Sequence, residues 1–136
     1  MKRGLVIICL LLLVYSCQQS TKVQNYPNEM SEMALSMRNM VDKLKQAKKD
    51  IEHGVLPNLS IEDFKNAHFT DSSFQKEGFN PMADALLLAA KNFDEYPSVD
   101  NYEIVVNTCR SCHEYMCPGP LEMINTLDLN GFKDFF

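Results

Sequence analysis

The sequence lacks tryptophan, has only 5 glycines and 6 prolines in 136 residues, and has no excess of positive charge. The low glycine and proline content excludes a fibrous or low-complexity chain. The 13 Lys and Arg residues against 18 Asp and Glu give a net charge of −5. That balance argues against a nucleic-acid partner, which would need a basic face. There is also only one long apolar run, which excludes a multi-pass membrane protein, and 46% hydrophobic residues argue against disorder.

The single apolar run lies at the N-terminus and has the features of an export signal. Lys2 and Arg3 precede the run Leu5–Tyr15, which is 11 residues long. A helix needs roughly 20 apolar residues to span a bilayer, so this run is short for a membrane anchor. Its length and basic start are typical of a signal peptide. An uncleaved N-terminal anchor is the alternative.

The end of the run resembles the lipobox of bacterial lipoproteins. Ser16 is a small residue directly before Cys17, and a polar stretch, 18–28, follows. The resemblance implies cleavage after residue 16 and lipidation of Cys17. We therefore expect a signal peptide over 1–16, a lipidated tether over 17–28 and a folded domain over 29–136. The expected location is a bacterial membrane, facing the periplasm.

Helical periodicity dominates the expected domain, and runs of alternating apolar and polar residues are missing. Over about 27–53, methionines and other apolar residues recur at helical spacings, lysines gather near the end, and Gly54 follows as a stop signal. Further helices are expected after Ser60, from Asn80 to before Pro97, and from Ser98 or Asp100 to before Pro118.

Loop residues are expected over 70–78, and the segment 121–136 is apolar enough to pack back on the helices. Helices in series with short connections predict an all-α fold, specifically an antiparallel four-helix bundle.

The chemistry-bearing motif is Cys109-Arg110-Ser111-Cys112-His113, which has the C-x-x-C-H spacing of c-type haem attachment. Residues at i, i+3 and i+4 lie on one side of a helix. Two thiols can then reach the two vinyl groups of one porphyrin, and His113 can bind the iron from the same side. The sequence predicts one covalent haem c on Cys109 and Cys112, with His113 as the proximal ligand.

Three other interpretations of the motif are open. A dithiol redox site usually begins a helix in a βαβ unit, and no strands are expected here. A zinc site would use Cys109, Cys112, His113 and Cys117, but four ligands along one helix enclose a tetrahedral ion poorly. The spacing could also arise by chance in a structural helix.

The chain has the C-x-x-C-H motif in its last expected helix and a methionine-rich first helix. In these two features it resembles the cytochrome c′ family of four-helix-bundle monohaem cytochromes. The resemblance implies that the first helix faces the open side of the haem. It then implies Met37 as the candidate distal iron ligand, with Met40 as the second candidate. It also leaves open a five-coordinate iron that binds NO or CO. Most of the methionines are expected to be core residues.

The leading functional hypothesis is a membrane-anchored, His/Met-ligated electron carrier rather than an enzyme. No acid–base pair or activated nucleophile is evident in the sequence. The acidic surface suits redox partners with a basic docking patch, and a homodimer is left open. A haem-free structural lipoprotein with a Cys/His metal site is a further alternative. Among the remaining polar residues, His53 is expected to contact a helix end, whereas His68, Arg110 and Lys65 are candidate partners for haem propionates.

Overall fold

The computed structural model describes residues 29–129, and within that range the secondary structure is entirely helical. The four α-helices are α2 (Glu32–Glu52), α3 (Phe79–Glu95), α4 (Val99–Tyr115) and the short α5 (Leu121–Asn125), with one 3₁₀ turn, η1, at Ser72–Phe74. The described residues contain no strand, which confirms the all-α prediction.

Serine side chains fix the starts of two of the long helices. The hydroxyl of Ser31 accepts a hydrogen bond from the Ala34 N–H at 3.1 Å, so α2 begins at Glu32, later than predicted. Ser98 caps α4 in the same way through the Asn101 N–H, and is one of the two starts that the sequence predicted. Helix α3 instead begins at Phe79 with Gly78 as its N-cap, so the predicted Asn80 cap is wrong by two residues.

Gly54 ends α2 because only a residue tolerant of the left-handed region fits there. Its φ is +78°, and its N–H donates to the carbonyl of Ile51 at 2.8 Å. The imidazole of His53 lies 2.6 Å from the carbonyl of Lys49, in the last turn of α2. His53 therefore contacts the helix end, as expected.

The helix predicted after Ser60 is wrong, because residues 55–64 form neither a helix nor a strand. The carboxylate of Asp94 on α3 accepts hydrogen bonds from the N–H groups of Leu59 at 2.6 Å and Ser60 at 3.0 Å. Ser60 has a left-handed φ of +44°, and the Lys43 ammonium donates to its carbonyl at 2.5 Å. A residue held in that conformation cannot begin a right-handed helix.

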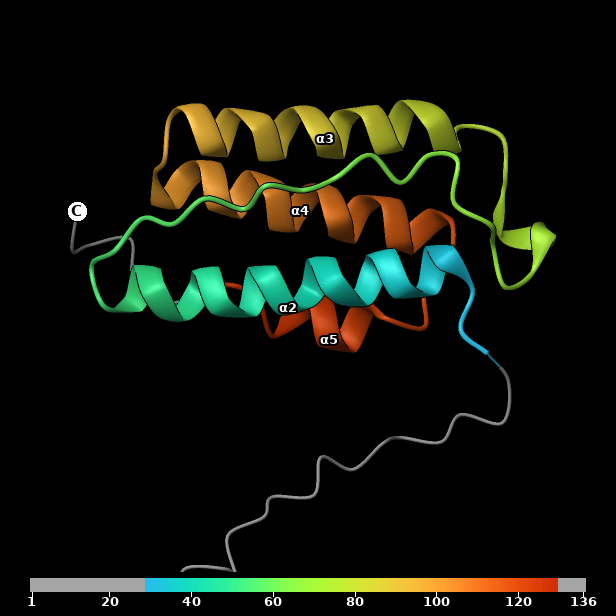
Figure 1. The fold of residues 1–136 in the computed structure, drawn as a ribbon, viewed down its shortest axis with the longest axis horizontal. Coiled ribbons are helices and arrows are strands. Elements are labelled where there is room, and N and C mark those ends of the chain that lie inside the picture. Colours follow the sequence, from blue (N-terminus) through green and yellow to red (C-terminus); the bar gives the residue numbers. More distant parts are fainter. Residues whose placement is uncertain (1–28, 130–136) are drawn as a thin grey trace, which may run out of the picture.

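Figure 1 shows α2, α3 and α4 side by side, with α4 running opposite to the other two. The extended segment 55–71 returns along α3 and α4, between the end of α2 and the 3₁₀ turn. Helix α5 packs against α4. Because α2 and α4 run in opposite directions, the first half of α2 and the last half of α4 lie at the same end of the molecule (Figure 1).

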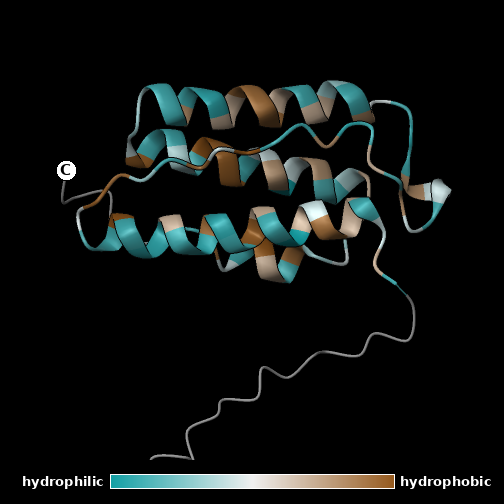
Figure 2. Ribbon diagram, viewed as in Figure 1, coloured by the Kyte–Doolittle hydropathy of each residue, from teal (hydrophilic) through white to brown (hydrophobic). Residues whose placement is uncertain are grey.

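Figure 2 shows both hydrophobic and hydrophilic positions on the helices, and the buried residues of each long helix recur at helical spacings, so each long helix buries one face. Tyr102 and Phe93 lie at the centre, both fully buried, with ring centroids 6.2 Å apart. The Tyr102 hydroxyl lies within hydrogen-bonding distance of the carbonyls of Leu44 at 3.1 Å and Leu127 at 3.0 Å. One central side chain therefore links α2, α4 and the chain after α5.

The prediction that the C-terminal segment packs back on the helices is confirmed as far as residue 129. Ile124, Leu127 and Leu129 are each at most 2% exposed. Residues 130–136 of that prediction lie outside the described range.

Candidate functional site

The C-x-x-C-H residues occupy the last two turns of α4. Cys109 is buried, at 7% exposure, while Cys112 and His113 are half-buried. Both thiols are free. At spacings of three and four on one helix, the three side chains share a side of α4, as the sequence predicted.

The His113 ring is oriented by the backbone just beyond the helix end. Its Nδ1 lies 3.0 Å from the Cys117 carbonyl oxygen, and the Cys117 Sγ lies 3.3 Å from the same nitrogen. A carbonyl oxygen only accepts hydrogen bonds, so Nδ1 carries the proton and Nε2 keeps its lone pair. Metal-binding histidines commonly donate their other ring N–H to a carbonyl in this way. His113 therefore fits the role of an iron ligand through Nε2.

Burial keeps the three thiols of this region protonated. It raises the pKa of Cys109 to about 12 from 9.0, with a smaller contribution from the nearby Cys112. The pKa of Cys112 is raised by burial and then by Cys117, and the pKa of Cys117 is raised by burial against an opposing effect of the Lys76 ammonium. Raised pKa values argue against a reactive dithiol pair, because such a pair needs a lowered thiol pKa.

The two candidate methionine ligands lie on α2. Met40 is buried, at 6% exposure, and Met37 is half-buried against the same core that contains Cys109. They belong to the first half of α2, the half at the same end of the molecule as the C-x-x-C-H residues (Figure 1). The fold thus brings both sets of predicted ligands to one end of the molecule.

The candidate propionate partners are engaged elsewhere. The Arg110 guanidinium pairs with Asp128 at 2.5 Å, and Lys65 pairs with Asp84 at 2.6 Å. His68 bonds to Glu32 through its ring Nδ1 at 2.7 Å, on the surface. The His68 amide N–H also donates to this carboxylate and is the largest cause that lowers the pKa of Glu32.

The contact of the Cys117 carbonyl with His113 was missed from the sequence. Cys117 was expected within the last helix, but α4 ends at Tyr115 and Cys117 follows it. Pro118 could have indicated this contact, because a proline ends the helix soon after His113 and leaves the Cys117 carbonyl without a helical partner.

Neither a converging metal cluster nor a membrane-spanning helix is found between residues 29 and 129. No three His, Cys, Asp or Glu side chains in that range converge on a metal position. No helix there is long and apolar enough to cross a membrane. A shallow pocket of about 540 Å³ lies between the extended segment and α3, lined in part by Asn58, Leu87 and Asp94, away from the C-x-x-C-H residues. The predicted signal peptide 1–16, the lipidation site Cys17 and the tether up to residue 28 lie outside the described residues.

In comparisons with known proteins, no protein-family model, curated protein or solved structure matches this chain.

Proposed function

We propose that this chain is a monohaem c-type cytochrome that carries electrons, held at a bacterial membrane by a lipid on Cys17 and facing the periplasm. The observation that carries the proposal is the local geometry of α4. Cys109 and Cys112 share a side of the helix with His113, whose Nδ1 is held 3.0 Å from a backbone carbonyl. This arrangement supplies two attachment thiols and one oriented imidazole.

Cys109 and Cys112 would form the two thioether bonds, and His113 would bind the iron through Nε2. Met37 or Met40, on the antiparallel helix α2, would supply the second protein ligand to the iron. When bound, the haem supplies a one-electron Fe(III)/Fe(II) couple. The proposed architecture is an antiparallel bundle similar to cytochrome c′.

The test is expression of the full chain with a haem-attachment system, followed by denaturing electrophoresis with haem detection and by pyridine haemochrome spectra. We expect one haem per chain, resistant to acidic organic extraction, with the spectrum of two thioethers. Cys112→Ala should give the spectrum of a single thioether or no attached haem. Cys117→Ala is the matched control and should keep both thioethers, because its backbone carbonyl remains to orient His113. Haem that extracts freely, or a Cys112→Ala variant with an unchanged spectrum, contradicts the proposal.

Electronic spectra of the same protein separate the electron carrier from its alternatives. A weak band near the red edge of the visible spectrum marks a bond between methionine sulfur and ferric iron. A high-spin spectrum that shifts with CO would instead indicate a five-coordinate protein that binds NO or CO. Absence of a Soret band would favour the haem-free structural lipoprotein, although no cluster of metal-binding side chains lies within residues 29–129.

The proposed partners are redox proteins at the same membrane. The net charge of −5 suits brief, salt-sensitive encounters with a basic docking patch. We propose no enzymatic activity and no nucleic-acid partner, and leave homodimer formation to a measurement of mass in solution.

A further inference from the structure

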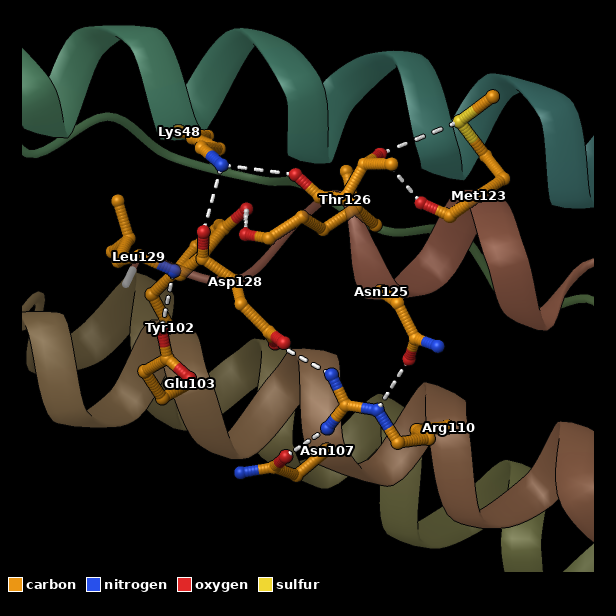
Figure 3. Close-up of polar contacts among 11 residues, drawn as sticks. Lys48, Tyr102, Glu103, Asn107, Arg110, Met123, Asn125, Thr126, Asp128 and Leu129 are labelled. Atoms are coloured by element: carbon orange, nitrogen blue, oxygen red, sulfur yellow. Dashed lines mark hydrogen bonds and ion pairs between the residues drawn. The ribbon is translucent and has the colours of Figure 1, made fainter. Parts of the chain in front are cut away.

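The four residues after α5, Thr126–Leu129, link α2 to α4; we call them the C-terminal strap. The Lys48 ammonium on α2 donates to the carbonyls of Thr126 at 2.9 Å and Asp128 at 2.7 Å (Figure 3). Thr126 and Asp128 follow Lys48 by 78 and 80 residues in the sequence. The strap is therefore fixed to the second half of α2.

Arg110, inside the C-x-x-C-H motif, fixes the other side of the strap. Its guanidinium donates to Asp128 at 2.5 Å and to Asn125 at 2.9 Å, and it also bonds to Asn107 (Figure 3). The side chains of the Arg110–Asp128 pair are only 22% and 25% exposed. A charge-assisted pair with further hydrogen bonds and little solvent exposure is stronger than an isolated surface pair.

Two further contacts complete the attachment to α4. The Glu103 carboxylate accepts the Leu129 N–H at 2.7 Å, and the Tyr102 hydroxyl lies 3.0 Å from the Leu127 carbonyl. The side chains of Leu127 and Leu129 are themselves buried. Polar contacts thus hold the backbone of the strap while its apolar side chains fill the core.

We infer that the C-terminal strap, through Arg110 and Asp128, positions α4 against α2 and so holds the methionine ligand in reach of the iron. This inference rests on the proposed function. Its physical basis is that the two proposed iron ligands come from different helices, His113 from α4 and Met37 or Met40 from α2. An iron–ligand bond tolerates only a few tenths of an ångström, so the spacing of these helices must be fixed. Arg110 adjoins Cys109 in the chain and is a positioning residue, because it acts through α4.

Two substitutions test the two sides of the strap in the full-length haem protein. Asp128→Asn removes the ion pair with Arg110 and keeps the side-chain shape. Lys48→Met removes both contacts from α2 and leaves Arg110–Asp128 intact. Asp84→Asn is the matched control, because it breaks the Lys65–Asp84 pair, which does not touch the strap.

The readout is displacement of the methionine ligand by added imidazole, followed through the band of the iron–sulfur bond, together with the reduction potential. We expect both strap variants to keep two thioethers but to exchange the methionine roughly tenfold faster, or more, than the parent. Their reduction potential should fall, because the iron loses part of its methionine ligation. Asp84→Asn should match the parent in both measurements. The double variant Arg110→Asp with Asp128→Arg restores the ion pair with its charges exchanged. It should recover part of the slower methionine exchange and of the reduction potential lost in Asp128→Asn.

The outcomes that overturn the inference differ from those that overturn the proposed function. Absence of covalent haem from the parent overturns both. A parent with two thioethers but no methionine ligation overturns the inference and leaves the haem attachment standing. Strap variants with helical content and exchange rates equal to the parent also overturn it. If Asp128→Asn fails to fold, Lys48→Met decides the question alone.

Discussion

Cys109 shows how burial of one side chain sets its chemistry before any haem is attached. At 7% exposure its thiol is the most buried of the three, and burial raises its pKa to about 12. An unmodified, folded chain therefore presents Cys109 as the least reactive of these thiols. If haem attaches here as proposed, the end of α4 has to open, or form late, before Cys109 reacts.

The raised pKa of Cys109 predicts that the haem-free protein loses stability in alkali. An unfolded thiol ionises near pH 9, whereas the folded thiol keeps its proton to about pH 12. Between these values the unfolded state binds fewer protons, so the free energy of unfolding falls as pH rises. The expected loss from Cys109 is on the order of 1 kcal/mol per pH unit, measured by urea unfolding.

The controls use variants and the haem protein. Cys109→Ala should make this pH dependence less steep, although its stability at neutral pH will be lower because a buried side chain is shortened. Cys117→Ala should change the slope less, since Cys117 is more exposed. In the haem protein neither Cys109 nor Cys112 can ionise, and burial also raises the pKa of Cys112, so the slope should be at least as shallow as that of Cys109→Ala. An unchanged slope in Cys109→Ala would show that other groups govern the alkaline loss.

At the scale of elements, the extended segment 55–64 depends on one carboxylate from another helix. Asp94 accepts the N–H groups of Leu59 and Ser60, and Leu59 is 1% exposed. Asp94→Ala leaves a partly buried donor unpaired and should lower the free energy of unfolding by about 1–3 kcal/mol. Thermal or urea unfolding measures the change. Asp84→Ala, also on α3 but in an exposed ion pair, should cost less than about 1 kcal/mol. Equal losses in the two variants would contradict the assigned role of Asp94.

The same segment shows how far local sequence determines the fold. The long helices α2, α3 and α4 could be predicted, because apolar periodicity and a cap such as Ser98 act within a few residues, whereas the cap at Ser31 was not predicted. The segment after Ser60 could not, because Asp94 lies about 35 residues away in the chain and overrides a local capping pattern.

The candidate site likewise has features that local sequence predicts and features that depend on distant residues. The spacing of Cys109, Cys112 and His113 is local and could be read directly from the sequence, as could their place in a helix. The partners of Arg110 could not, because Asn125 and Asp128 follow it by 15 and 18 residues across a turn. The contact of His113 with the Cys117 carbonyl depended on where α4 ends, and helix ends are set by backbone geometry that periodicity does not resolve.

At the scale of the whole molecule, the proposed site lies at one end of the folded domain, and the chain also enters α2 at that end (Figure 1). The predicted tether 18–28 has 11 residues, which gives a flexible chain a typical reach of about 17–20 Å. A lipid on Cys17 would then keep the proposed haem site close to the membrane surface. Partners embedded in the same membrane would be reached without long-range diffusion.

This arrangement predicts the behaviour of a Cys17→Ser variant. Lipid labelling should be abolished, because the serine cannot form the thioether that carries the lipid, and the haem domain should move from the membrane fraction to the soluble periplasmic fraction. Haem content should be unchanged, since Cys109, Cys112 and His113 are untouched. Fractionation with a high-salt wash, followed by haem detection, measures the location and the haem content of the variant. Cys9→Ser is the matched control, because it also removes an N-terminal thiol but leaves the Ser16–Cys17 pair intact. Loss of the acyl chains removes about 0.8 kcal/mol of membrane affinity for each buried CH₂, so the variant should leave the membrane. A Cys17→Ser variant that stays in the washed membrane fraction would show instead that Leu5–Tyr15 is retained as an anchor or that the domain binds a membrane partner tightly.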